Sequence, residues 1–238
     1  MFLIFDTETT GLPKNYKAPL TDFANWPRLV QLAWQCHDHA GKFLFAKNYV
    51  VKPNGFVIPG RIARNLHHIT TRKAHEIGRD IDFVLREFAT DVQNATLLVG
   101  HNIGFDLNIV GCEFLRRGME NVLAKANTLC TQKSSTEFCG IIRDGKPKWP
   151  NLTELHRKLF STPFADAHNA AGDVVATARC FLELARIGVI DAKQLNISNA
   201  ELEEFKRYHT AAIQPESVDY ETFAKPTFFE TIQLWKRI

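Results

Sequence analysis

The stretch Phe2-Leu3-Ile4-Phe5-Asp6-Thr7-Glu8-Thr9-Thr10-Gly11 decides the fold, because it sets two acids at the end of an apolar run. The apolar run predicts a buried strand. In an extended strand residues i and i+2 share a face, so Asp6 and Glu8 point together. Carboxylates this close repel each other unless a cation lies between them, and oxygen ligands suit a divalent metal ion. Alone, such a triplet more often marks a solvated strand end, so the prediction of a metal site depends on partners elsewhere in the chain.

The composition indicates one α/β domain with an extension. The chain has 238 residues, of which 45% are hydrophobic, enough for a full core. The five scattered cysteines, with no C-x-x-C pair, indicate neither a disulfide framework nor a thiolate zinc site and favour a reducing cytoplasm. The N-terminal apolar run is too short for a signal peptide and no stretch can span a bilayer, so we expect a cytoplasmic protein. The formal net charge of +3 leaves nucleic acid open as a partner.

Periodicity along the chain predicts three strands followed by alternating helices and strands. The expected strands cover residues 2–5, 29–36 and 43–51, as an antiparallel meander, and then 96–100 and 127–131. The expected helices cover 72–77, 80–92, about 102–118, 151–159, about 169–187 and 199–209. This order predicts an α/β fold with a mixed central sheet and helices on both faces, in a domain of residues 1–188. Residues 189–238 form a helical and aromatic extension that either packs on the domain or binds a partner.

Two further acids lie early in predicted helices. Asp106 ends the segment HNIGFD, and Asp173 ends the segment HNAAGD. Together with the first pair, these four carboxylates could hold two divalent ions, and oxygen ligands without cysteine select magnesium or manganese. Two such ions suit phosphoryl hydrolysis. His168 should sit on the loop before the helix of Asp173, where an imidazole could take a proton from an attacking water near neutral pH.

The segments FDTETTG, HNIGFD and HNAAGD, in this order and at these separations, resemble the three motifs of the DEDDh (DnaQ-like) 3′-5′ exonucleases. The resemblance covers residues 1 to about 188 and implies an RNase H-like fold. It also implies two magnesium or manganese ions on four carboxylates, with a histidine as general base. These residues are Asp6, Glu8, Asp106, Asp173 and His168. Within the family the chain resembles most the epsilon proofreading subunit of bacterial DNA polymerase III, which implies release of nucleoside 5′-monophosphates from DNA 3′ ends in proofreading or repair.

The resemblance also implies a set of substrate contacts. Asn65-Leu-His-His-Ile-Thr70 resembles the family's "HGIT" segment, which lies beside the terminal nucleotides, with His68 in place of the usual Gly. The backbone N–H groups of Thr9 and Thr10 could reach the terminal 3′-hydroxyl, the alternative being a polar turn that leaves the strand. His101 and Asn102 could touch substrate, but a strand-end histidine and a helix N-cap explain them equally well. The predicted substrate-binding residues are Thr9, Thr10, His67, Ile69, Thr70, Asn102 and Phe105.

Two basic stretches and an aromatic tail lie outside these motifs. Residues 61–73 interleave cations with apolar residues and favour nucleic-acid contact, whereas Arg143, Lys146 and Lys148 are more typical of plain solvation. The tail over residues 214–238 is rich in apolar side chains, which fit either a polymerase or sliding-clamp partner or packing on the domain. These side chains are Phe223, Phe228, Phe229, Leu234 and Trp235.

Three functions remain open at this point. The first is a DNA 3′-5′ exonuclease, the second an exoribonuclease of the same family, and the third a catalytically silent nucleic-acid or polymerase-binding module. The complete set of acids favours an enzyme, because a silent module should lack a ligand. The expected partners are single-stranded or frayed 3′ ends of DNA, or of RNA. The metal motifs do not separate the two, since sugar discrimination depends on contacts to the 2′-hydroxyl.

Overall fold

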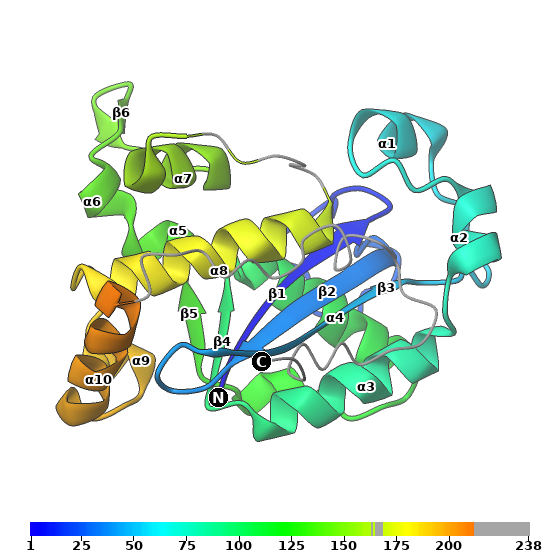
Figure 1. The fold of residues 1–238 in the computed structure, drawn as a ribbon. Helices are drawn as coiled ribbons and strands as arrows, with labels where there is room; N and C mark the ends of the chain where they lie inside the picture. The colour runs from blue at the N-terminus through cyan, green and yellow to red at the C-terminus, as the bar shows by residue number, and fades with distance from the viewer. Residues whose placement is uncertain (163, 165–168, 212–238) are drawn as a thin grey trace.

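A five-stranded mixed sheet forms the centre of the computed structural model, which describes residues 1–162, 164 and 169–211 (Figure 1). The strands are β1 (Phe2–Thr9), β2 (Leu29–His37), β3 (Phe43–Val50), β4 (Leu97–Gly100) and β5 (Thr128–Cys130). Their order is β3-β2-β1-β4-β5. The pairs β1–β2 and β2–β3 are antiparallel, and β1–β4 and β4–β5 are parallel. The predicted mixed sheet is confirmed, but β1 continues to Thr9 because its backbone keeps pairing with β2 beyond Phe5.

Helices cover both faces of the sheet, as the sequence predicts. Helix α8 crosses one face, and α3 and α4 cover the other (Figure 1). The helices are α1 (Gly60–Asn65), α2 (Thr71–Ile77), α3 (Ile81–Asn94), α4 (Gly104–Arg116), the 3-10 turn η1 (Val122–Lys125), α5 (Thr131–Ser134), α6 (Thr136–Cys139), α7 (Leu152–Phe160), α8 (Ala170–Arg186), α9 (Ala192–Leu195) and α10 (Asn199–Ala211). Within the described part of the chain, no helix has the length and apolar character needed to cross a membrane.

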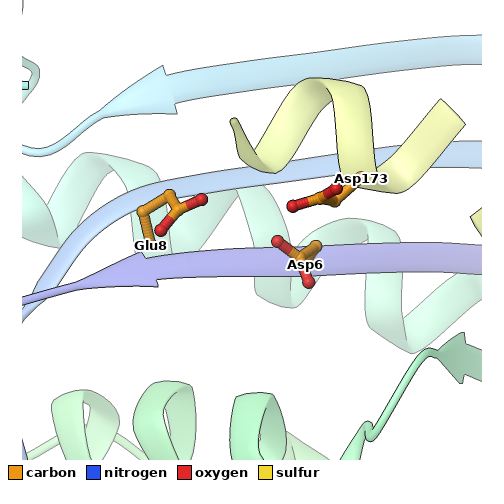
Figure 2. A group of neighbouring side chains, drawn as sticks. All are labelled: Asp6, Glu8 and Asp173. Atoms are coloured by element: carbon orange, nitrogen blue, oxygen red, sulfur yellow. The ribbon is translucent and has the colours of Figure 1, made fainter. Parts of the chain in front are cut away.

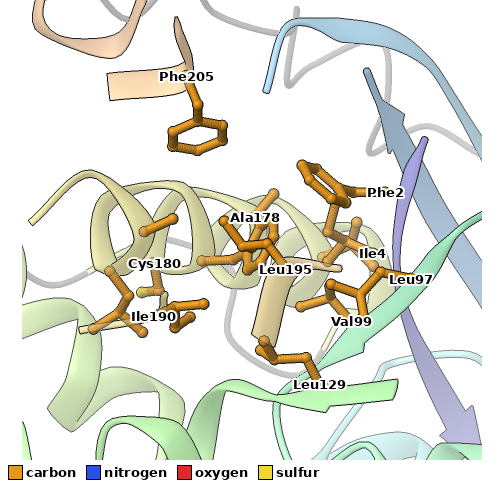
Figure 3. Packing of buried hydrophobic residues seen from close by; sticks show 14 of the residues in the cluster. Phe2, Ile4, Leu97, Val99, Leu129, Ala178, Cys180, Ile190, Leu195 and Phe205 are labelled. Carbon is orange, nitrogen blue, oxygen red and sulfur yellow. The ribbon is translucent and has the colours of Figure 1, made fainter. Parts of the chain in front are cut away.

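The opening strand supplies the centre of two hydrophobic clusters. Phe2 and Ile4 pack with α8 on one face (Figure 3), whereas Leu3 and Phe5 pack with α3 and α4 on the other. All four side chains are fully buried. Because successive side chains of a strand point to opposite faces, one short apolar run anchors helices on both sides. Each such burial contributes about 1.5–3 kcal/mol to folding.

The first part of the C-terminal extension packs on the domain. Leu195 from α9 and Leu202 and Phe205 from α10 belong to the same cluster as α8, and Phe205 is fully buried. These helices therefore complete the core on the α8 face. The predicted apolar tail, Phe223 to Trp235, lies outside the described residues.

The segment from Ile141 to Trp149 forms a small hairpin of β6 (Ile142–Arg143) and β7 (Lys146–Pro147). The Asp144-Gly145 pair is typical of a tight turn, and the structure has such a turn there. Asp144 and Gly145, at the centre of the turn, have φ values of 50° and 72°. Two positive φ angles are what a type I′ turn between paired strands requires.

The predicted N-cap at Asn102 is wrong. Helix α4 begins at Gly104 after Ile103, and Asn102 has a φ of 65°. An N-cap needs extended backbone so that its side chain can reach the next amides, and the left-handed conformation of Asn102 does not provide it. The short helices α1, α5, α6 and α9 were not predicted, because segments of four to six residues carry too little periodicity.

Candidate metal centre

The alternation along β1 decides which acids meet. Asp6 and Glu8 continue the face of Phe2 and Ile4, which lies under α8, whereas Thr7 continues the opposite face, which lies under α4. The first pair of acids therefore points toward the helix that carries Asp173. The prediction that Asp6 and Glu8 share a face follows from the same alternation.

Asp6, Glu8 and Asp173 form a cluster of three carboxylates (Figure 2). One oxygen from each lies within 4.8 Å of the others, and all three residues are half-buried. Asp173 reaches the cluster from the first turn of α8, whose N-cap Asn169 accepts a hydrogen bond from the amide of Ala171 at 3.1 Å. The arrangement offers several oxygen ligands to one small space, as a divalent cation needs.

The electrostatics of the cluster also fit a cation. The pKa of Glu8 is raised to about 8, mainly by burial and further by Asp173 and Asp106. The pKa of Asp6 is raised well above its ordinary value, first by burial and then by the charges of Asp106, Asp173 and Glu8. Without a cation, the folded state resists ionising these groups, since burial and like charges both penalise the anion. A divalent cation would offset both effects, so the residues present fit such an ion.

Asp106 lies outside the group of three. Its Oδ1 accepts hydrogen bonds from the backbone N–H of Thr7 at 3.0 Å and from the Thr7 hydroxyl at 2.6 Å. Burial raises the pKa of Asp106 to about 7, although the Thr7 hydrogen bonds act in the opposite direction and Asp173 adds to the rise. The structure thus brings three of the four predicted acids together and holds the fourth beside them through the residue between Asp6 and Glu8.

A buried amide network sets the start of α8 relative to the sheet. The Nε2 group of Gln31 donates to Oδ1 of Asn48 at 2.8 Å and to Oδ1 of Asn169 at 3.2 Å. Gln31 also stands opposite Glu8 in the β1–β2 register. It therefore links β2, β3 and the N-cap of the helix that carries Asp173. The motifs of the sequence do not include this residue, although a glutamine within an apolar strand is a usable signal.

Thr9 and Thr10 are both engaged at the end of β1. The Thr9 hydroxyl donates to the carbonyl of Gly11 at 2.6 Å. The backbone N–H of Thr10 donates to the carbonyl of Arg28 at 3.0 Å, and its hydroxyl accepts from the Arg28 amide at 2.9 Å. The Thr10 N–H therefore already has one acceptor within the protein.

The segment that resembles "HGIT" lies beside the end of β1. Burial lowers the pKa of His67, and the nearby backbone of Thr9 partly opposes this effect. His67 accepts at Nδ1 from the amide of Ile69 at 3.1 Å, and Ile69 is buried in a cluster with Val30 and Val50.

Two other positions of this segment, Thr70 and His68, have a defined local structure. Thr70 caps α2 by accepting from the amide of Lys73 at 3.1 Å. His68 has a φ of 58°, in the left-handed region where a glycine is usual. The position thus keeps a glycine-like backbone although it carries a histidine.

The residues of HNIGFD have separate roles. Both ring nitrogens of His101 are engaged, Nδ1 with the Thr131 hydroxyl at 3.0 Å and Nε2 with the Pro150 carbonyl at 3.1 Å, and burial lowers its pKa to about 4. This favours a structural role for His101. Asn102 is exposed, and Phe105 packs in part against the cluster on the α4 face. His168, the predicted general base, lies outside the described residues.

Comparison with known families gives a match over most of the chain. Residues 3–181 match the family model described as Exonuclease (RNase_T). No curated protein sequence matches the chain significantly.

Solved structures with a similar fold include exonuclease I, with a TM-score of 0.61 and 18% identity over 88% of this chain and 43% of that one. E. coli exonuclease I in complex with a dA16 oligonucleotide has a TM-score of 0.59 and 19% identity, over 82% of this chain and 42% of that one. Exonuclease X in complex with 5′-overhanging duplex DNA has a TM-score of 0.51 and 20% identity, over 82% of this chain and 97% of that one. The chain thus spans less than half the length of exonuclease I. These likenesses confirm the RNase H-like fold.

Proposed function

The chain belongs to the exonuclease family, and from this premise we propose that it is a metal-dependent 3′-5′ exonuclease that releases nucleoside 5′-monophosphates from DNA. The observation that carries the proposal is the cluster of Asp6, Glu8 and Asp173, whose ligand atoms lie within 4.8 Å of one another. Burial and mutual repulsion both disfavour three ionised carboxylates at this spacing. A bound divalent cation would offset both effects.

We propose that these three carboxylates hold magnesium or manganese, and that Asp106 is the remaining acid for a second ion. When bound, such ions would supply Lewis acidity for phosphodiester hydrolysis. The protein itself holds the acids in position. Thr7 holds Asp106 through two hydrogen bonds, and the Gln31 network holds the start of α8. His168 is proposed to accept the proton of the attacking water, a role suited to an imidazole near neutral pH.

We also propose that the substrate is DNA and that the role is proofreading or repair. The names of the similar structures support nucleic acid as the substrate class, since E. coli exonuclease I was seen with dA16 and exonuclease X with duplex DNA. An RNA substrate is the alternative. A relation to the epsilon subunit, and a polymerase or clamp partner for the tail over residues 214–238, are proposed from the sequence pattern alone.

The test uses matched 5′-labelled single-stranded DNA and RNA, incubated with the protein and manganese. Parallel reactions contain EDTA or the Asp6→Ala variant. We expect DNA to shorten stepwise from its 3′ end, and both EDTA and the variant to abolish the products. Faster shortening of RNA would move the function to RNA processing. Intact 3′ ends on both substrates would refute an exonuclease and favour a silent binding module.

A further inference from the structure

The β6–β7 hairpin carries a surface that the metal centre does not use. It projects beyond α6 and α7 at the β5 end of the molecule (Figure 1). Ile142 is 63% exposed and Trp149, just after the hairpin, is 58% exposed. Arg143 and Lys146 are exposed too, and no ion pair between described residues includes either side chain. A large indole left in solvent and flanked by unpaired cations is unusual for a purely structural turn.

The backbone around Trp149 is fixed, although its side chain is exposed. The amide of Lys148 donates to the carbonyl of Ile141 at 2.8 Å, and Lys148 pairs with Glu154 on α7. On the other side, the carbonyl of Pro150 accepts from His101 and from Gln132, each at 3.1 Å. The ring of Trp149 is therefore presented from a pre-organised loop. Rigid aromatic side chains of this kind bind partners at low entropic cost.

The hairpin is connected to the edge of the sheet that carries the acids. Pro150 is held by His101, which directly follows β4, and β4 lies between β1 and β5. Neighbouring strands are about 4.8 Å apart, so β5 lies roughly 10 Å from β1 along this edge. The β6–β7 hairpin lies farther out than β5, beyond α6 and α7 (Figure 1), so a single strand whose 3′ end reached the metal centre would meet the hairpin with upstream nucleotides and not with its last few.

We propose that Trp149, Lys133, Arg143 and Lys146 form a surface, called the hairpin surface, that binds single-stranded nucleic acid upstream of its 3′ end. The ammonium group of Lys133 lies 5.9 Å from the ring centroid of Trp149. The indole would stack on a base and the three cations would face phosphates. The positive charge around the ring distinguishes this occupant from an apolar protein partner. The proposal rests on the proposed function, because it assumes a 3′ end in the metal centre.

The test compares oligothymidines of twelve and three nucleotides. Binding of labelled dT12 is measured by fluorescence anisotropy in EDTA, and kcat/KM is measured for both lengths with manganese. Trp149→Ala should weaken dT12 binding roughly tenfold, the order expected for loss of one stacked base. The same variant should lower kcat/KM for dT12 and leave kcat/KM for dT3 unchanged. Trp149→Phe keeps a stacking face and should restore most of the dT12 binding.

Two further variants separate this surface from damage to the fold. Arg143→Ala combined with Lys146→Ala changes exposed side chains only, and should weaken dT12 binding and flatten its salt dependence. Tyr208→Ala on α10, which removes another exposed aromatic ring, is the matched control and should bind as the wild type does.

Unchanged dT12 binding in both hairpin variants, or an equal loss for dT3 and dT12, would overturn the proposal. Unchanged binding would instead favour a protein partner for this surface. Trp149-dependent binding of dT12 in EDTA without any cleavage in manganese would refute the exonuclease but keep the hairpin surface.

Discussion

Glu8 should make the metal-free protein less stable as the pH rises, and Glu8→Gln should remove this effect. Burial, with Asp173 and Asp106, raises the pKa of Glu8 from 4.5 to about 8. The folded state therefore binds a proton that the unfolded state releases between these values. The stabilisation of the folded state by this bound proton is fully present below pH 4.5 and is lost as the pH rises through 8.

The size of the effect follows from the two pKa values. One unit of pKa difference corresponds to about 1.4 kcal/mol, so between pH 5 and pH 7.5 this single group should cost the metal-free protein about 3 kcal/mol. Glutamine keeps the shape of the side chain but binds no proton. The free energy of unfolding of Glu8→Gln, relative to that of the wild type, should therefore rise by about 3 kcal/mol over the same interval.

Urea unfolding in EDTA at pH 5 and pH 7.5 measures this difference, followed by a repeat at pH 7.5 with excess magnesium. Magnesium should stabilise the wild type, by about 2.7 kcal/mol at a hundred times its Kd, and stabilise Glu8→Gln much less. Glu137→Gln, which changes an exposed carboxylate on α6, is the control and should behave as the wild type does. An identical pH dependence for the wild type and Glu8→Gln would refute the reasoning.

Three other predictions concern side chains around the site and at its borders. Thr7→Val removes the hydroxyl that holds Asp106 at 2.6 Å and should lower kcat roughly tenfold while costing about 1 kcal/mol of stability, as checked by kinetics and urea unfolding on one preparation. His68→Gly relieves a φ of 58° and should raise the free energy of unfolding by about 0.5–1 kcal/mol, whereas His75→Gly on α2 should lower it by a similar amount. Glu113→Ala removes a carboxylate, only 1% exposed, that pairs with two arginines, and should lower the free energy of unfolding by about 3–5 kcal/mol. Thermal or urea unfolding measures this, and a loss below about 1 kcal/mol would contradict the prediction.

The strands, the main helices and the pairing of Asp6 with Glu8 could be predicted from the sequence, because each depends on short-range periodicity. Four apolar residues followed by two acids at i and i+2 fix a strand and the side to which its acids point, whatever the rest of the chain does. The mixed sheet follows from the order of the elements. Local patterns failed where the backbone conformation was set by its neighbours, as at Asn102, which adopts a left-handed conformation in place of an N-cap.

Only the tertiary structure decided which distant groups serve the site. Thr7 holds Asp106 across 99 residues of chain, and Gln31 holds Asn169 across 138, so no local pattern contains either contact. The sequence by itself determined the chemistry available to this protein, because ligand atoms are properties of side chains. The structure determined that three acids lie within reach of one cation, and that the fourth is held by a threonine from the other face of the strand. The reason is that contacts between distant segments depend on how the helices pack on the sheet.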